Sequence, residues 1–96
     1  MFVLITYDIN TETAEGRRRL SRIAKVCQNH GQRVQNSVFE CILDSTQLLG
    51  LKQKVNKIID IKKDSVRYYN LGSSWQNKVE HKGAKPSYDP EGLLIL

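Results

Sequence analysis

The sequence predicts a small α+β domain in which two helices cover one face of an antiparallel sheet. Its 96 residues suit a single domain. A hydrophobic content of 40% is enough for one modest core. Two segments with helical hydrophobic spacing alternate with β-rich segments along the chain, which is typical of a helix layer packed on a sheet.

The first strand and the first helix are predicted from residues 2–31. Phe2–Tyr7 is apolar on both faces, as in a central strand, and Asp8–Thr11 ends it. Thr13 is a suitable cap for the next helix. Gly31 is expected to end that helix in the left-handed conformation. Four residues of the helix recur at i, i+3, i+4 and i+7: Leu20, Ile23, Ala24 and Cys27.

A hairpin and a second helix are predicted next. The alternation breaks at Asn36-Ser37, and Asn tolerates the positive φ of a tight turn. We therefore expect Arg33–Gln35 to pair with Val38–Leu43. Asp44-Ser45 offers a cap for a helix. The buried stripe of that helix is Leu48, Leu51, Val55, Ile58 and Ile59.

Asp64–Leu71 is expected to be a strand and Trp75–His81 an edge strand, with a turn between them. The order β-α-β-β-α-β is the ferredoxin-like arrangement. We predict that residues 1–81 form this domain and that residues 82–96 form a loop and an extra C-terminal strand. The apolar end, Leu93, Leu94, Ile95 and Leu96, is expected to dock on its own sheet or to add a strand to that of a partner protomer.

The charge balance favours polyanionic partners. Fifteen Lys and Arg against 10 Asp and Glu give a formal net charge of +5. Cys27 and Cys41 belong to no CxxC motif, so we interpret them as small buried hydrophobic residues rather than as a disulfide or a metal site. The chain shows no signal-peptide pattern, and its apolar start is too short to cross a membrane, which predicts a cytoplasmic protein.

Asp8, at the end of the first strand, is the candidate for chemistry. A carboxylate there suits Mg²⁺ or Mn²⁺, hard cations held by one or two carboxylates and several waters. The alternative is that Asp8 caps the following loop or the helix. Two-fold symmetry would place two Asp8 residues near one axis, where they repel unless a cation lies between them. Such a metal could activate water toward a phosphodiester.

Basic residues on the first helix are candidates for phosphate contact, the alternative being an ordinary solvated face. They include Arg17, Arg18, Arg19 and Arg22, with Lys25 on the same stripe as Arg18 and Arg22. Arg17 and Arg19, near Asp8 in sequence, are expected in the active region. The basic residues assigned to the second helix are more scattered and are interpreted as solubilising: Lys52, Lys54, Lys57, Lys62 and Lys63.

Arg33, Ser37 and Phe39 lie on or beside the predicted hairpin turn. Phe39 is expected in the core or an interface, although an exposed Phe on a sheet can stack a base. Trp75, on the predicted edge strand, could anchor an interface.

Three segments together resemble the CRISPR-associated protein 2 family: Tyr7–Asn10 after an apolar strand, Gly31–Cys41, and Asp64–Gly72. The ending, Val79–Leu96, resembles members of subtype I-C. The resemblance implies a homodimer of ferredoxin-like subunits whose C-terminal strands cross to the partner, with Asp8 of each protomer able to share a divalent metal. It also implies that Tyr7, Arg17, Arg19, Arg33, Ser37 and Phe39 lie where family members carry residues tied to activity or nucleic-acid binding.

The resemblance leaves the use of the site open. One hypothesis is a Mg²⁺-dependent endonuclease that acts in spacer acquisition with the CRISPR integrase, in antiviral defence. Subtype I-C likeness favours double-stranded DNA over single-stranded RNA as substrate. The other hypothesis is a non-catalytic dimer that bridges integrase dimers on DNA. A generic RNA-binding domain on the same fold would carry a K/R-G-F/Y-G/A-F motif, and the strands have none.

Overall fold

The computed structural model describes residues 1–73, 80 and 82. The predicted edge strand Trp75–His81, apart from Glu80, and the apolar end Leu93–Leu96 lie outside the described residues. Six elements follow one another in the predicted order: β1 (Phe2–Asp8), α1 (Ala14–Gln28), β2 (Gly31–Gln35), β3 (Val38–Ile42), α2 (Ser45–Ile58) and β4 (Ser65–Gly72).

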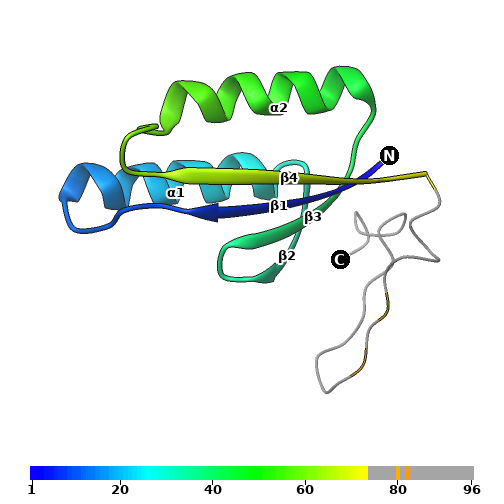
Figure 1. The fold of residues 1–96 in the computed structure, drawn as a ribbon, viewed down its shortest axis with the longest axis horizontal. Coiled ribbons are helices and arrows are strands. Elements are labelled where there is room, and N and C mark those ends of the chain that lie inside the picture. Colours follow the sequence, from blue (N-terminus) through cyan, green and yellow to red (C-terminus); the bar gives the residue numbers. More distant parts are fainter. Residues whose placement is uncertain (74–79, 81, 83–96) are drawn as a thin grey trace.

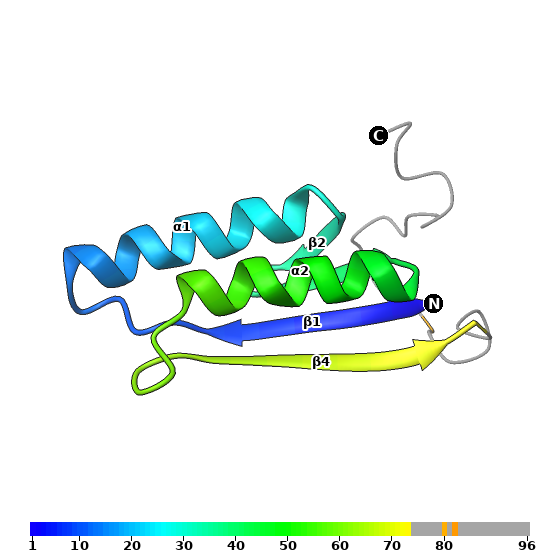
Figure 2. The ribbon, with the colours of Figure 1, turned by 90° about the horizontal axis from the view of Figure 1, so that it is seen from above.

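The described strands form one antiparallel sheet in the order β2-β3-β1-β4, with the two helices side by side on one face (Figures 1 and 2). This arrangement confirms the predicted ferredoxin-like fold. β1 is central, so Ile5 pairs with Phe39 of β3 on one side and with Tyr68 of β4 on the other. The β1–α1 and α2–β4 connections consequently lie at the same end of the molecule (Figure 1).

Both predicted helix caps are confirmed. The Thr13 hydroxyl accepts a hydrogen bond from the Gly16 N–H at 3.1 Å at the start of α1. At the start of α2, the Asp44 carboxylate accepts from the Gln47 N–H at 2.7 Å, and the Gln47 side chain accepts from the Asp44 N–H at 2.9 Å. This reciprocal capping box satisfies two backbone donors that the helix leaves unpaired.

Two predictions of positive φ are wrong. Among the described residues, only Gly72 has a positive φ, of 75°. Asn36 therefore makes its turn with a negative φ, and a register shift between Arg33 and Gln35 lies beside this turn. Helix α1 ends at Asn29 in the right-handed region, and Gly31 already belongs to β2.

Gly31 is required because β2 and β3 approach each other closely at this position, and not because the residue needs a positive φ. A Cβ atom at this position would collide with Cys41 Sγ and the Glu40 carbonyl oxygen on β3. Gly31→Ala is therefore expected to destabilise the protein by about 1–3 kcal/mol, because overpacking forces neighbouring groups to shift. Urea unfolding measures this effect.

Gly50→Ala is the matched control for Gly31→Ala. Gly50 lies inside α2, and an added Cβ meets nothing within 4 Å. The change should stabilise the helix by up to about 1 kcal/mol, since Ala is a better helix former than Gly. Equal effects of the two substitutions would contradict the packing role of Gly31.

The hydrophobic core lies between the sheet and the helices. It is built from alternate residues of β1 (Val3, Ile5 and Tyr7) together with Ile23, Cys27, Phe39, Cys41, Leu51 and Val55. Cys27 and Cys41 are both free and buried, and burial raises their thiol pKa values to about 11 and about 12. They are therefore protonated hydrophobic residues at neutral pH, which confirms the interpretation from sequence.

The opposite face of the sheet carries the alternate set of strand residues, because successive side chains in a strand point to opposite faces. It includes Leu4 and Thr6 of β1, Val38 and Ile42 of β3, and Tyr69 of β4. The first four are half-buried, and Tyr69 is 43% exposed. We call this surface, defined by those five residues, the open face; α1 and α2 do not cover it.

Candidate active site at the end of the first strand

Asp8 is the last residue of β1 and is exposed to solvent. It pairs with Ser65 at the start of β4 and belongs to the same alternating set as Leu4 and Thr6. Its carboxylate therefore lies at the end of the open face, away from the two helices. The pairing with β4 holds Asp8 in place without burying it.

The carboxylate of Asp8 receives no hydrogen bond and forms no ion pair within the described part of the chain. The capping roles considered for it belong to other residues. Asn10 Oδ1 accepts the Glu12 N–H at 3.0 Å in the loop, and Thr13 caps the helix. Asp8 is thus a charged group that the domain positions but does not use for its own stability.

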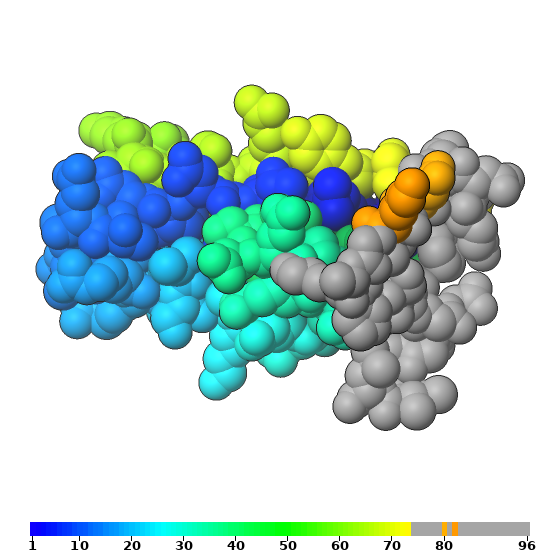
Figure 3. All heavy atoms as spheres, turned by 90° about the horizontal axis from the view of Figure 1, so that it is seen from below, coloured from blue at the N-terminus to red at the C-terminus, as the bar shows by residue number. Residues whose placement is uncertain are grey.

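The turn of the β2–β3 hairpin lies beside Asp8. The Tyr7 N–H donates to the Ser37 carbonyl oxygen at 3.1 Å, and the Tyr7 hydroxyl donates to the Asn36 carbonyl oxygen at 3.3 Å. These bonds extend the pairing between β1 and β3 into the turn. A shallow hollow of about 700 Å³ runs along the hairpin and is lined by Arg33, Ser37 and their neighbours; Figure 3 shows the hairpin surface beside that of α1.

The expected direct contacts of Tyr7 and Phe39 with nucleic acid are not available in this structure. Tyr7 is 5% exposed and Phe39 0% exposed, so neither ring offers a face to a base. Their rings stack with centroids 6.1 Å apart, and the Arg33 guanidinium lies 5.2 Å from the centre of the Phe39 ring. The two rings therefore support the exposed Arg33, which remains available for a phosphate.

Burial raises the pKa of the Tyr7 hydroxyl, and the nearby Cys27 adds to this effect while Arg33 opposes it. The hydroxyl is therefore protonated at neutral pH and serves as a hydrogen-bond donor to the hairpin. This chemistry gives Tyr7 a structural role beside Asp8.

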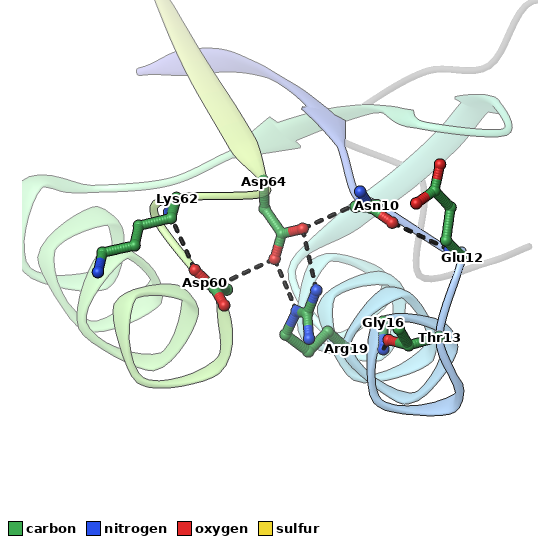
Figure 4. A network of polar contacts seen from close by, with 8 residues as sticks. All are labelled: Asn10, Glu12, Thr13, Gly16, Arg19, Asp60, Lys62 and Asp64. Carbon is green, nitrogen blue, oxygen red and sulfur yellow. Dashed lines mark hydrogen bonds and ion pairs between the residues drawn. The ribbon is translucent and has the colours of Figure 1, made fainter.

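Asp64 is the centre of a polar network that joins both connections at this end of the molecule (Figure 4). Its carboxylate accepts bonds from Arg19 Nε at 2.7 Å and Nη2 at 3.3 Å. It also accepts the Asn10 N–H at 3.0 Å and the Asp60 N–H at 2.9 Å. The carboxylate thereby ties the loop after Asp8 to α1 and to the segment before β4.

The carboxylate of Asp64 is ionised despite having no exposed side-chain surface. Burial by itself would raise the pKa of Asp64. The hydrogen bond from Arg19, the backbone bonds from Asp60 and Asn10, and the charge of Arg19 together outweigh burial and lower the pKa below its ordinary value. The ion pair is therefore intact at neutral pH.

Arg19 has a role within the domain that its position in the sequence did not indicate. Its side chain is only 14% exposed and pairs with Asp64, and its expected contact with nucleic acid stays a prediction. The other three arginines of α1 are exposed. Arg17 donates to the Thr11 carbonyl oxygen at 3.2 Å, whereas Arg18 Nη2 lies 3.9 Å from Glu15 Oε1 in an exposed ion pair. Arg22 forms no ion pair within the described residues.

The described residues of the chain do not supply a complete metal site. No group of three or more His, Cys, Asp or Glu side chains comes together there. A single unpaired carboxylate fits a hard divalent cation that keeps most of its water ligands. Asp8 suits this role, because its carboxylate is exposed and accepts no hydrogen bond from the described chain.

Comparison with known proteins places this chain in a family. The model of the family "CRISPR associated protein Cas2" matches residues 1–79. The chain belongs to the Cas2 family. A relative from Chlorobaculum tepidum, the CRISPR-associated endoribonuclease Cas2, is 62% identical over 96 residues, which cover 100% of both chains. A relative from Halalkalibacterium halodurans, the CRISPR-associated endonuclease Cas2, is 60% identical over 96 residues, again covering both chains fully.

A solved Cas2 structure has the same fold. The crystal structure of Streptococcus pyogenes Cas2 at pH 6.5 superposes with a TM-score of 0.76 and 53% sequence identity. The match covers 86% of this chain and 100% of that chain. The Cas2 resemblance expected from the three sequence segments is thus confirmed. In the described residues, no helix of this Cas2-family chain is long and apolar enough to cross a membrane.

Proposed function

We propose that this Cas2-family protein is a Mg²⁺-dependent endonuclease that cleaves phosphodiester bonds with Asp8 as its metal ligand. The observation that carries the proposal is the exposed Asp8 carboxylate, fixed at the end of β1 without a hydrogen bond from the described chain. The names of its relatives, an endoribonuclease and an endonuclease, support a nuclease activity. Mn²⁺ can replace Mg²⁺ in the proposal, because both prefer oxygen ligands.

The working form in this proposal is a homodimer in which Asp8 of each protomer contributes to one metal site. The half-buried apolar residues of the open face support dimerisation, since a sheet face that retains this much apolar surface is suited to a partner. Asp8 lies at the end of that face. A metal bound there would supply an activated water and offset charge on the phosphodiester. The chain's part is to hold the carboxylates in place.

Double-stranded DNA is the proposed substrate, on the subtype I-C resemblance of the chain's ending. The proposed setting is spacer acquisition with the CRISPR integrase. The Chlorobaculum relative is named an endoribonuclease, and this name supports single-stranded RNA as the alternative substrate. The bridging role between integrase dimers remains a prediction, and it is compatible with cleavage.

A cleavage assay on an RNA and a duplex DNA of matched sequence, with Mg²⁺ and with a chelator, tests the proposal. We expect the DNA to be cut only when the metal is present. Cleavage of the RNA but not of the DNA would change the proposed substrate to RNA and leave the proposed metal site unchanged. Cleavage that continues unchanged in the chelator would overturn the metal role.

Removal of the apolar end is expected to weaken the dimer. The run Leu93–Leu96 is proposed to add a strand to the partner's sheet. A dimer of the chain shortened by these residues should therefore have a higher dissociation constant than the wild-type dimer. Sedimentation velocity over a dilution series measures the change. An unaltered profile would show that the open face alone holds the two protomers together.

A further inference from the structure

Arg67 of β4 is a basic residue that lies on the same face of the sheet as Asp8. It pairs with Thr6 of the open face, and side chains of directly paired residues share one face of the sheet. The described strands contain one other basic residue, Arg33, which is in register with Phe39 and lies over the ring of that core residue. Arg67 is therefore the basic residue that the described strands place on the side of the open face.

The register of β1 and β4 brings Arg67 close to Asp8. Asp8 pairs with Ser65, and Arg67 follows two residues later on β4, which runs alongside β1 (Figure 2). Asp8 and Arg67 are thus diagonal neighbours on one face of an antiparallel pair. The Cβ atoms of such neighbours are about 7–8 Å apart, a separation that a long side chain can span. The guanidinium can therefore reach a group bound at the Asp8 carboxylate.

The charge of Arg67 is not used within the described part of the chain. The side chain is exposed and forms no ion pair there. Its Nη1 donates to the Tyr69 hydroxyl at 3.4 Å, and this bond raises the pKa of Arg67, so the guanidinium stays charged. Tyr69 lies farther along β4 from the partner of Asp8 than Arg67 does. A bond this long and this exposed is weak, so the guanidinium can exchange it for a phosphate oxygen.

Hydrolysis of a phosphodiester creates negative charge that a cation on this face would stabilise. The water oxygen forms a bond to phosphorus, and the bond from phosphorus to one ester oxygen breaks. One proton of the water ends on the leaving oxygen, and the other stays on the new phosphate oxygen. Charge develops on the phosphate oxygens between these two events. The planar fork of a guanidinium donates to two such oxygens at once.

We propose that Arg67 is a second catalytic residue of the Asp8 site, which donates to the phosphate oxygens as hydrolysis proceeds. This inference rests on the proposed function and adds a group that stabilises the transition state directly. Asp8 holds the metal in this arrangement, and Arg67 supplies a cation that the protein itself carries on the same face. Donors already aimed at developing charge lower the barrier without having to reorganise during the reaction.

The test measures single-turnover cleavage, at saturating Mg²⁺, of the nucleic acid that wild type cuts. R67A should slow cleavage by about 100-fold, as expected for the loss of one transition-state donor. R67K should recover only part of the rate, because an ammonium keeps the charge but lacks the fork. Methylguanidinium added to R67A should restore part of the rate and should leave D8N unchanged.

K63Q is the control for loss of charge. Lys63 is exposed in the turn just before β4, so the substitution removes a positive charge from the same end of the molecule as Asp8. The turn is not part of the open face, and K63Q should cleave at the wild-type rate. An equal loss in K63Q and R67A would show that only the net charge matters, which would overturn the role of Arg67.

The remaining outcomes separate this inference from the proposed function. R67A that cleaves like wild type, while D8N is slow, would overturn the inference alone. R67A that is slow, is not rescued by methylguanidinium and sediments as a monomer would assign Arg67 to the dimer interface instead. D8N that cleaves as fast as wild type, or wild type that does not cleave, would overturn the proposed function and this inference with it.

Discussion

Asp8→Asn is expected to slow Mg²⁺-dependent cleavage by at least about 100-fold. A bound metal ion supplies several kcal/mol of transition-state stabilisation, and each 1.4 kcal/mol or so is a factor of ten in rate. Asn keeps the size of the side chain but lacks the charge that a hard cation requires. Single-turnover cleavage at saturating Mg²⁺ measures the loss.

The same substitution should leave the folded domain intact, because the Asp8 carboxylate accepts no hydrogen bond from the described chain. When a chelator removes the metal, the dissociation constant of the variant dimer should be no higher than that of the wild-type dimer, since the two facing carboxylates that repel each other in wild type are absent. Glu12→Gln is the matched control: it removes an exposed charge from the loop that follows β1. A comparable loss of activity in Glu12→Gln would contradict a specific role for Asp8.

Asp64→Asn is expected to destabilise the protein by about 2 kcal/mol at neutral pH. The substitution leaves Arg19 without its anionic partner and weakens the bonds to the Asn10 and Asp60 N–H groups. The effect should be smaller than for a deeply buried pair, because Arg19 remains 14% exposed and can reach water. Urea unfolding at equilibrium measures the difference.

The difference between wild type and Asp64→Asn should depend on pH. The pKa of Asp64 is lowered in the folded protein, so its contribution is fully present above the unfolded value of about 3.9. It is lost as the pH falls through the lower, folded pKa. The two unfolding free energies should therefore converge in acid. Asp44→Asn is the control, since Asn caps a helix as well as Asp does and the stability should change little.

The elements that the sequence predicted correctly depend on local patterns. Thr13 and Asp44 cap helices through bonds to residues three positions away, so a short window of sequence contains both partners. The central position of β1 likewise follows from its apolar residues on both faces. Asp8 was found as a candidate because it is a carboxylate at the end of that strand.

The features that sequence analysis missed depend on contacts between distant residues. Arg19 and Asp64 are 45 positions apart, and nothing in either segment indicates the pair. Strand β3 carries Phe39 and Cys41 on one face and Val38 and Ile42 on the other, so its apolar pattern could not decide which face is buried. Gly31 follows a helical pattern as a capping glycine does, although its role is the close approach of β2 to β3.

One signal would have found part of what was missed. Asp64 begins a predicted strand and Asp8 ends another, and the antiparallel pairing of β1 with β4 brings the two chain positions to the same end of the sheet. The antiparallel packing of the two helices is visible only in the structure.

The hydrogen bond from the Asn10 N–H to Asp64 has a consequence for the order of events during synthesis. The loop that follows Asp8 is made early, but its anchor emerges from the ribosome only after α2 is complete. Contacts this far apart in the chain form late, because the intervening loop must close first. In a nascent chain the loop after Asp8 is thus unanchored, and we expect the carboxylate to reach its final position only when the last described strand joins the sheet.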